Sequence, residues 1–592
     1  MSVPEIHFLP SIKKGNGTGH LRRCARLASS LEKGVLSLPT AGWPGHFTLE
    51  EIETFTRGLI DFRRIGTTLP EGGDGFLVLD QRKTESLLWN ALPPDWPVIG
   101  IDEGGVFRFR MDYLLDTLPG LKTSVPAHRT GTGLLGAPTN RRTWPERLEK
   151  VLAVFGGEDA AGLTGKFLKD WAAAGAPSGL PELWVCGASS SASHLFPSWV
   201  KPFPPTNHLA EDLHKFDLVI TSFGLTAFEA LAAQVPVLLR SPSRYHHLLA
   251  RQAGLPLLSR GSGGVKRRLG DYPGIVEACR KAVSGKEDQP PLEEILRDLI
   301  LPAPRCPGCG QLSRRRGRPF HPLLARFPHR TFRRCRSCGL VYQILHRKEE
   351  KEYTTEYFFE EYSRQYGRTY LDDFPQLRAL AASRVKILDT LIPRGSTILD
   401  LGCAYGAFLL EAREAGHRPV GIDVVPSAVA HVSGKLGLEA RVFSLDRWKS
   451  PSDLGVDRAD AVTLWYVIEH IADLKTFLQV LSSFQKTGDV LAFSTPHLGG
   501  ISSRRDRTLF LRQSPGDHHH IWSPRIARTL LALYGYRIRR VRITGHHPER
   551  FPGASFLSPT SKCFRLLRGF SRLAGWGDTF EIYAVKVGEG IF

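Results

Sequence analysis

The stretch TILDLGCAYGAFLLEA, residues 397–412, decides the fold of the C-terminal part of this 592-residue chain. An apolar run ends at Asp400, a turn with Gly402, Ala404 and Gly406 follows, and a helix-like segment comes next. Glycine lets a turn approach a ligand closely, and the start of the next helix offers unpaired N–H groups. The pattern therefore predicts a ligand-binding turn between a buried strand and a helix.

A carboxylate follows at the end of the next expected strand. Asp423 closes the segment RPVGID, 21 residues after Gly402. A carboxylate at this place accepts hydrogen bonds from ribose hydroxyls, in dinucleotide folds and in S-adenosylmethionine folds alike. The turn and this aspartate leave the choice between the two ligands open.

Residues 345–592 resemble class I S-adenosylmethionine-dependent methyltransferases. DLGCAYGAFL is similar to their first motif, GIDVVPSAV to their second, and residues 460–497 to their fourth strand, acceptor-facing loop, helix and fifth strand. The runs YGYRIRRVRI (534–543) and FEIYAVKV (580–587) resemble the antiparallel strand pair that closes this fold. The resemblance implies S-adenosylmethionine as the cofactor.

The resemblance also implies roles for single residues. The expected catalytic residues are Glu469 and His470, at the end of the fourth expected strand, with His470 as the base; a supporting or packing histidine is the alternative. The segment GDHHHIWSP (516–524) predicts either an acceptor-site histidine or only a helix entry, with Ser523 capping a helix from Pro524. The expected cofactor contacts are Asp400, Gly402, Ala404 and Gly406 for the amino acid part, Asp423 for ribose and Asp446 for adenine.

Two C-x2-C pairs, CPGC (306–309) and CRSC (335–338), lie 25 residues apart. Gly310 and Gly339 follow them, as a tight metal knuckle requires. Four thiolates at this spacing predict a closed, structural zinc site; redox activity of either pair is the alternative. A zinc ribbon and a helix like YFFEEYSRQYGRTY (357–370) before such a domain resemble methyltransferases of sugars and other small metabolites. The expected zinc ligands are Cys306, Cys309, Cys335 and Cys338.

A second glycine turn, GNGTGHLRRC (15–24), stands near the start of the chain. It resembles the Gly-x-Gly-His-x-x-Arg-Cys turn of the nucleotide-sugar hydrolase of pseudaminic acid biosynthesis, which has the two-lobed GT-B glycosyltransferase architecture. VLAVFGGEDAAGLT (151–164) and DLVITSFGLTAFEALAAQVPVLL (217–239) are similar to later parts of that family, in the same order. The resemblance covers residues 1–260 and implies a nucleotide sugar as ligand.

By that resemblance His20 is the catalytic histidine, a general base for water or a sugar hydroxyl; a capping or surface histidine is the alternative. Leu225 stands where a second glycine is usual, and Glu103 where a second aspartate is usual. These departures leave open whether this half of the chain hydrolyses a nucleotide sugar, transfers its sugar or only binds it. The expected substrate contacts are Gly17, Gly19, Arg23, Ser222, Gly224, Thr226 and, at the ribose, Glu229.

Short apolar strands alternate with amphipathic helices in both halves, which predicts an α/β protein with parallel sheets. The proline-containing stretch at 284–294 is typical of the edge of a linker between domains. An arginine cluster (313–319) lies between the cysteine pairs. The expected domains are a GT-B-like N-terminal lobe (1–145), a nucleotide-binding lobe (146–295), a zinc ribbon (303–345) and a Rossmann-like methyltransferase domain (346–592).

The composition bears on the binding partners and the location of the protein. A formal net charge of +19 favours anionic partners, although solvated basic faces explain it equally well. Nine cysteines without a disulfide framework, no secretory leader and no apolar run of about 18 residues predict a cytoplasmic protein without a membrane span.

Together these features predict a fusion enzyme that methylates a sugar or glycan intermediate, with a nucleotide-sugar module in front. The rivals are a front half that only binds its ligand and, less favoured, methylation of RNA, for which no base-flipping motif follows the fourth expected strand.

Overall fold

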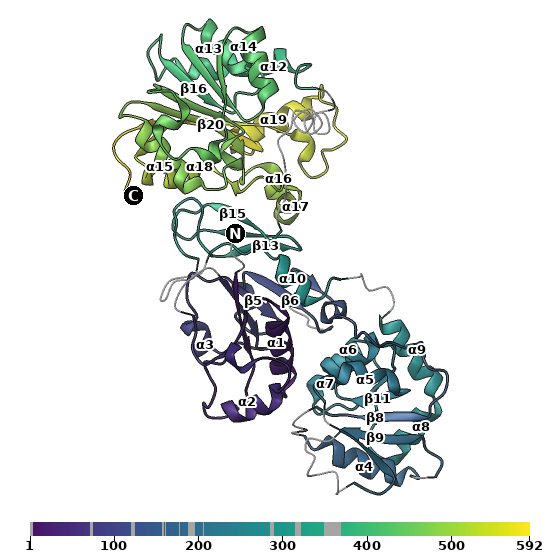
Figure 1. The fold of residues 1–592 in the computed structure, drawn as a ribbon. Coiled ribbons are helices and arrows are strands. Elements are labelled where there is room, and N and C mark those ends of the chain that lie inside the picture. Colours follow the sequence, from purple (N-terminus) through teal and green to yellow (C-terminus); the bar gives the residue numbers. More distant parts are fainter. Residues whose placement is uncertain are drawn as a thin grey trace. The chain divides into compact units, whose positions relative to one another are not determined.

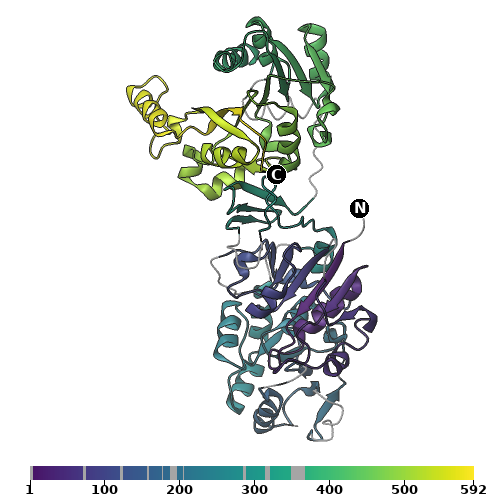
Figure 2. The ribbon, with the colours of Figure 1, turned by 90° about the vertical axis from the view of Figure 1, so that its left-hand side faces the viewer.

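The chain divides into two compact units, Met1–Ala303 and Pro304–Phe592 (Figures 1 and 2). The helix expected over 357–370 and the arginine cluster lie almost entirely outside the described residues, as does part of the expected linker. The computed structural model describes residues 4–70, 75–119, 125–156, 159, 161–176, 178–186, 196–204, 206–283, 289–313, 321–347, 367 and 369–591.

The first lobe of the N-terminal unit is a seven-stranded sheet in the order β3-β2-β1-β4-β5-β6-β7, parallel throughout. Its longer strands are mostly apolar and buried, as expected of a parallel sheet covered on both faces. The strands are β1 Glu5–Pro10, β2 Gly34–Ser37, β3 Ile65–Gly66, β4 Gly75–Asp80, β5 Val98–Ile101, β6 Tyr113–Asp116 and β7 Arg129–Thr130; the helices are α1 Gly19–Ser30, α2 Leu49–Thr56 and α3 Ser86–Ala91.

The second lobe is a five-stranded parallel sheet in the order β10-β9-β8-β11-β12. The strands are β8 Lys150–Ala153, β9 Glu182–Cys186, β10 Val200–Phe203, β11 Leu218–Thr221 and β12 Val237–Leu239. The helices are α4 Leu163–Ala173, α5 Leu209–Asp212, α6 Leu225–Ala232, α7 Arg244–Gln252, α8 Ser262–Gly270 and α9 Tyr272–Val283.

Helix α10, Leu292–Asp298, follows the second lobe in sequence but belongs to the core of the first. Its Leu292, Ile295 and Leu296 are buried together with residues of β1 and α1. The chain therefore crosses back between the lobes before the N-terminal unit ends, which holds the two lobes in one unit.

The C-terminal unit contains a second seven-stranded sheet in the order β18-β17-β16-β19-β20-β23-β22, in which β23 is antiparallel to both of its neighbours. Helices α12, α13 and α14 lie on one face of this sheet, and α15 and α18 on the other (Figure 1). The strands are β16 Thr397–Leu401, β17 Arg418–Asp423, β18 Glu439–Val442, β19 Ala461–Trp465, β20 Val490–Pro496, β22 Tyr536–Thr544 and β23 Thr579–Lys586. The helices are α12 Phe374–Leu388, α13 Ala407–Glu414, α14 Pro426–Lys435, α15 Leu474–Phe484, α16 Ile501–Arg505, α17 Arg507–Gln513, α18 Pro524–Leu533 and α19 Lys562–Ala574.

The cysteine-rich segment adds a small antiparallel sheet, β13 Leu323–Phe327, β14 Arg330–Arg334 and β15 Val341–Leu345. A fourth strand comes from far along the chain: β21, His520–Ile521, pairs with β15. The Tyr534 hydroxyl also donates to the Gly308 carbonyl at 2.5 Å. The cysteine-rich segment thus shares a sheet and a core with the following domain.

The predicted α/β class is confirmed, and so is the antiparallel pair of strands expected at the end of the chain. In the part of the chain that the structure describes, none of the helices has the length and apolar character needed to traverse a lipid bilayer.

Candidate functional site

The first candidate site lies at the carboxyl end of β16, where the strand order reverses between β16 and β19. Open α/β sheets bind ligands at such a switch point. Gly402 and Gly406 have φ angles of +79° and +81°, and Ala404 has +47°. A Cβ atom at Gly402 would collide with Val467, so the turn needs glycine there for space as well as for its backbone angle.

Asp423 ends β17 and braces this turn. Its carboxylate accepts the backbone N–H groups of Ala404 at 2.8 Å and Val425 at 2.9 Å. Asp400 is 1% exposed and accepts the Thr463 hydroxyl at 2.6 Å. The structure therefore brings the predicted acidic residues of the first two motifs to one edge of the sheet. Asp446 lies in an exposed turn after β18.

Burial disfavours the charged form of both acids. Burial raises the pKa of Asp400 to about 7, and the hydrogen bond from Thr463 offsets this only in part. Burial also raises the pKa of Asp423, against the hydrogen bonds from Val425 and Ala404. A ligand that donates hydrogen bonds or carries positive charge would stabilise the ionised form of these carboxylates.

A cluster of acidic and imidazole groups lies beyond the end of β19. The short 3-10 turn Ile468–His470 carries Glu469 and His470, so they follow the strand rather than end it. His470 Nδ1 is 3.4 Å from Asp517 Oδ2, and the rings of His470 and His518 meet edge to face with centroids 4.7 Å apart. A carboxylate oxygen of Glu469 and one ring nitrogen each of His470 and His518 all lie within 4.8 Å of one another.

Glu469 is the buried member of this cluster, at 1% exposure. Among the described residues its Oε2 atom has no hydrogen-bond partner. Burial raises its pKa to about 7, with the charge of His470 opposing the shift. A carboxyl group that is half ionised near neutral pH can accept a proton, which makes Glu469 a candidate base beside His470.

The GDHHHIWSP loop caps a helix, as one of its two interpretations expected, and the acceptor-site histidine stays a prediction. The Ser523 hydroxyl accepts the Ile526 N–H at 3.3 Å and caps α18, while Asp517 and His518 reach His470. The His519 N–H donates to the Glu469 carbonyl at 2.8 Å, which ties the loop to the 3-10 turn.

Sequence reasoning missed two residues here. Asp517 stands beside a run of three histidines, a signal that could have pointed to it. Tyr466 follows β19 with a φ of +62° and is 41% exposed. A bulky residue rarely adopts this angle, and such strain is concentrated at functional sites. No pattern in the sequence reveals this backbone conformation.

The four predicted zinc ligands come together. Cys306 Sγ lies 3.7 Å from Cys338 Sγ, Cys309 Sγ lies 3.5 Å from Cys335 Sγ, and all four sulfurs are within 4.8 Å of one another. A tetrahedral zinc with bonds of about 2.3 Å requires sulfurs about 3.8 Å apart. The donor set and its spacing therefore fit a zinc ion.

The same two turns repeat around the cluster. Gly310 and Gly339 both have positive φ, at +71° and +81°, and their N–H groups donate to the carbonyls of Cys306 and Cys335. The glycines expected after each pair thus form equivalent knuckles.

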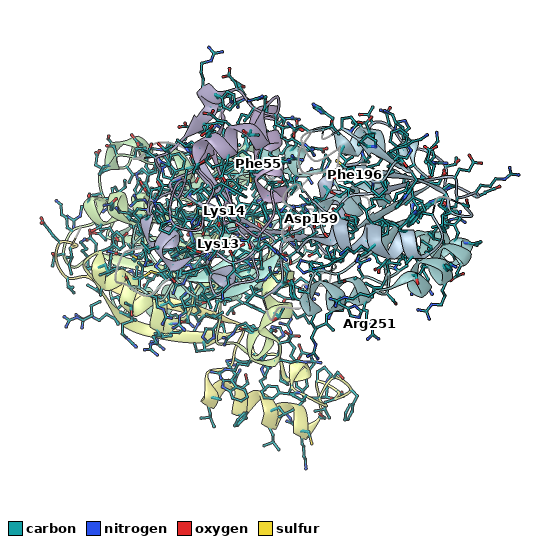
Figure 3. The ribbon with its side chains drawn as sticks, turned by 90° about the horizontal axis from the view of Figure 1, so that it is seen from below. Lys13, Lys14, Phe55, Asp159, Phe196 and Arg251 are labelled. Carbon is teal, nitrogen blue, oxygen red and sulfur yellow. The ribbon has the colours of Figure 1, made fainter. Side chains whose placement is uncertain are left out.

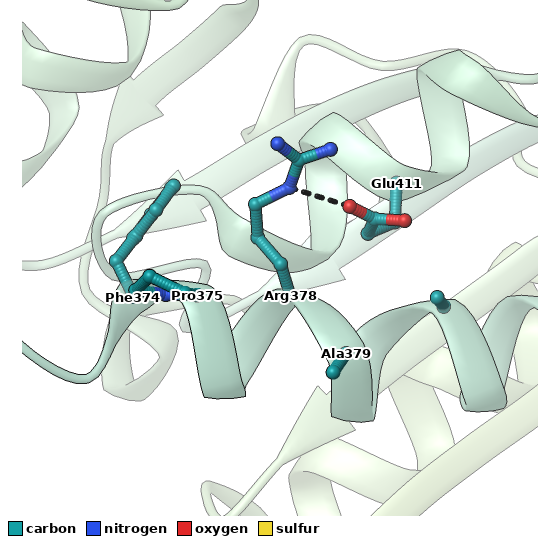
Figure 4. Close-up of a pocket in the computed structure, with 6 residues that line it drawn as sticks. Phe374, Pro375, Arg378, Ala379 and Glu411 are labelled. Atoms are coloured by element: carbon teal, nitrogen blue, oxygen red, sulfur yellow. Dashed lines mark hydrogen bonds and ion pairs between the residues drawn. The ribbon is translucent and has the colours of Figure 1, made fainter.

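An open pocket of about 340 Å³ lies between α12 and α13, away from these groups. Arg378 Nε contacts Glu411 Oε1 at 2.5 Å at its edge (Figure 4). Neither Asp400, Asp423 nor Glu469 lines it. It is therefore separate from the candidate cofactor and acceptor sites.

The second candidate site lies at the carboxyl ends of β1 and β4, the switch point of the first lobe. His20 Nδ1 is 2.5 Å from Asp80 Oδ1. Arg23 Nε and Nη2 donate to the two oxygens of Asp80, each at 2.7 Å, and Nη2 also donates to Asp102 at 3.0 Å. The structure therefore brings the predicted His20 and Arg23 together around one buried carboxylate.

Charge and burial oppose each other at Asp80, which is 0% exposed. Burial alone would raise the pKa of Asp80, but the charges of Arg23 and His20 hold it well below its usual range. Asp80 is therefore an anion that fixes the orientation of the imidazole. Arg23 is only 8% exposed and is occupied by Asp80 and Asp102, so its contact with a substrate stays a prediction.

The glycine loop before His20 is held from both sides. Lys13 pairs with Glu85 at 3.3 Å and Lys14 with Glu51 at 2.7 Å; Figure 3 labels both lysines. Both pairs are exposed and contribute little to stability. Gly17, in this loop, has a φ of +77°.

The expected phosphate and ribose contacts of the second lobe gather at the start of α6. Ser222, Gly224 and Thr226 are partly exposed there. Glu229 pairs with Arg26 of the first lobe at 3.3 Å, and its expected contact with a ribose stays a prediction. A nucleotide at this place would have to share or displace that ion pair.

The chain resembles methyltransferases in sequence. A family of methyltransferase domains matches residues 372–541. A ubiquinone biosynthesis O-methyltransferase of Xanthomonas axonopodis pv. citri is 33% identical over 129 residues, 21% of this chain and 54% of that protein. Its counterpart in Nitrobacter winogradskyi is 33% identical over 103 residues, 17% of this chain and 39% of that protein. The chain thus spans about half the length of these relatives or less.

One solved structure in the comparison is a SAM-dependent methyltransferase from Archaeoglobus fulgidus. It is 16% identical, covers 39% of this chain and 100% of its own, and has a TM-score of 0.29.

Proposed function

We propose, on the premise that the C-terminal region is a class I S-adenosylmethionine-dependent methyltransferase domain, that this chain methylates a small-molecule acceptor. The observation that carries the proposal is the position of Glu469 and His470 beyond β19, next to the glycine turn of β16. S-adenosylmethionine, when bound, would supply the methyl group as an electrophile.

The chain's own residues would hold that ligand. The turn from Gly402 to Gly406 lets backbone groups approach the amino acid part, and Asp423 offers carboxylate oxygens to ribose hydroxyls. The pKa of Asp400 is raised by burial, and a cationic ligand beside it would stabilise its ionised form.

His470 would take the proton from the acceptor hydroxyl. Asp517, 3.4 Å from His470 Nδ1, would orient the ring so that Nε2 faces the acceptor. Glu469 is the alternative base, since its Oε2 atom is buried without a partner among the described residues. The similarity to O-methyltransferases favours oxygen as the methylated atom.

The cysteine cluster would hold one structural zinc ion. Four buried thiol groups leave no open position for a substrate, so the ion would stabilise the fold. Because β15 pairs with β21, the metal would also stabilise the loop that carries Asp517 and His518.

The N-terminal unit would handle a nucleotide sugar, with the acceptor a sugar or glycan intermediate. Support comes from His20, whose Nδ1–H would donate to Asp80 and leave Nε2 to accept a proton from water or a sugar hydroxyl. The expected ligand contacts at Gly17, Gly19, Ser222 and Thr226 belong to this proposal.

A front half that only binds its ligand is the second candidate. Leu225 favours it, because this side chain occupies the start of α6, where phosphate would approach the backbone. RNA methylation is the third, with the expected zinc ribbon and the basic net charge in its favour.

One experiment separates these functions. The full chain is incubated with methyl-labelled S-adenosylmethionine and a panel of nucleotide sugars, free sugars, phenols and RNA, and the labelled pool is identified. In parallel, nucleotide release from the same nucleotide sugars is measured for the wild type and for His20→Ala. Label in a sugar pool supports the proposal. Nucleotide release that is abolished by His20→Ala supports catalysis by the N-terminal unit. Label in RNA alone contradicts the small-molecule acceptor.

A further inference from the structure

Helix α19 carries an apolar face that is exposed among the described residues of the C-terminal unit. Leu566 and Leu573 are 72% and 91% exposed, and Phe570 is 50% exposed. Cys563 is also exposed, and the four residues recur at spacings of three and four, so they share one side of the helix. Phe556, in the loop before it, is 81% exposed.

The helix is anchored at its base. Trp576 stacks on Phe551 with ring centroids 5.8 Å apart and meets Phe570 edge to face at 5.3 Å. Leu567 packs into the same cluster, and the Ser561 side chain accepts the Phe564 N–H at 3.2 Å to cap the helix. The exposed face therefore belongs to a formed helix, the yellow one that projects from its unit in Figure 2.

The charged residues of the helix itself all have one sign. Residues 550–577 contain no aspartate or glutamate. Three arginines of the helix lie on the side away from the exposed leucines, and one lysine precedes them. The basic residues are Lys562, Arg565, Arg568 and Arg572, whereas Arg550, before the helix, is paired with Asp578 at 2.7 Å.

We propose that α19 docks this chain on the surface of an anionic lipid bilayer. Leu566, Phe570 and Leu573 would enter the boundary between headgroups and acyl chains, and the basic residues would lie near lipid phosphates. A helix with a polar, arginine-rich face and a leucine and phenylalanine face lies in this boundary without crossing it. The absence of acidic residues favours a phosphate-bearing surface over a protein groove with mixed charge. The inference goes beyond methyl transfer, which none of these residues performs.

The test is co-sedimentation of the full chain with vesicles. Vesicles of phosphatidylcholine alone are compared with vesicles that contain a third of phosphatidylglycerol, at low and high salt. We expect binding to the anionic vesicles that weakens with salt. The double variant Leu566→Gln/Leu573→Gln should lower the partition coefficient at least about tenfold, since two exposed leucines no longer insert.

The matched control is Leu87→Gln on α3, which removes a leucine that is 70% exposed in the other unit. It should bind as the wild type does. The triple variant Arg565→Gln/Arg568→Gln/Arg572→Gln should lose most of the preference for anionic vesicles. Failure of the wild type to sediment with anionic vesicles overturns the proposal. Unchanged binding by the leucine variant overturns it as well, and so does a loss of self-association in that variant while vesicle binding persists.

Discussion

Leu225 Cδ1 lies 3.3 Å from the place where a Cβ atom would stand on Gly19. These are the first residues of α6 and α1, so the two helices meet at their N-termini within the N-terminal unit. Glycine at position 19 is what leaves room for the leucine. The same leucine fills space at a helix start, where N–H groups would otherwise face an anion.

Replacing this leucine should therefore open the site. We expect Leu225→Gly to strengthen the binding of nucleotide sugars at least about threefold, since backbone N–H groups become accessible. Isothermal calorimetry with UDP- and CMP-sugars measures this. Leu225→Met keeps the volume and serves as the control. Equal affinity in the wild type and both variants would show that the leucine does not limit access.

Asp423 should be essential for the cofactor. Asp423→Ala removes a carboxylate expected at the ribose, along with the acceptor of the Ala404 and Val425 N–H groups. We expect S-adenosylmethionine affinity to fall about 30-fold or more, in line with about 2 kcal/mol or more for charged hydrogen bonds. Calorimetry measures the loss. Glu439→Ala, an exposed acid on β18, is the control and should bind normally. Normal binding by the Asp423 variant would contradict the proposed site.

Glu469 should make stability depend on pH. Burial raises its pKa from 4.5 to about 7, so the folded chain holds this proton more tightly than the unfolded chain. The associated stability is complete below about pH 4.5 and is lost as pH rises to about 7, by about 3 kcal/mol. Glutamine does not titrate, so Glu469→Gln should lose less stability across this range.

Urea unfolding at pH 4.5 to 8 measures this difference. His470 and Asp517 lie beside Glu469 in both proteins, and the substitution removes only the carboxyl group, so the difference between the two stability profiles reports on Glu469. The methyl-transfer rate of the wild type should rise through about pH 7 as the Glu469 carboxyl group loses its proton. Parallel stability curves for the two proteins would contradict a raised pKa.

The cysteine cluster should bind about one zinc ion per chain, measured by elemental analysis. Cys335→Ser should lose the metal and lower the melting temperature. It should also lower the methyl-transfer rate, because β15 pairs with β21 directly after the loop of Asp517 and His518. Cys563→Ser changes an exposed cysteine outside the cluster and should leave the metal content and the rate unchanged. A metal-free chain with undiminished heat stability would argue against a structural zinc.

Local sequence patterns were enough to predict parts of the candidate sites. The turn at Gly402 to Gly406 and both C-x2-C knuckles are short, and their chemistry is set by residues adjacent in the chain. Sequence spacing was therefore enough to predict that Asp423 ends the strand next to the glycine turn and that the four thiols gather around one point.

Contacts between distant segments were beyond such reasoning. Arg26 pairs with Glu229, which lies 203 residues away, and Asp517 reaches His470 from a different loop. No local propensity encodes these distances, because they depend on how sheets and loops pack.

By itself the sequence determined the α/β class, the two glycine turns and the cysteine quartet, since hydrophobic periodicity and turn chemistry act over a few residues. Only the tertiary structure decided that α10 returns to the first lobe, that β21 joins the cysteine-rich sheet and that Glu469 is buried. Burial and long-range pairing are properties of the packed chain, and they shift the pKa of a carboxyl group in a way that its neighbours in sequence do not.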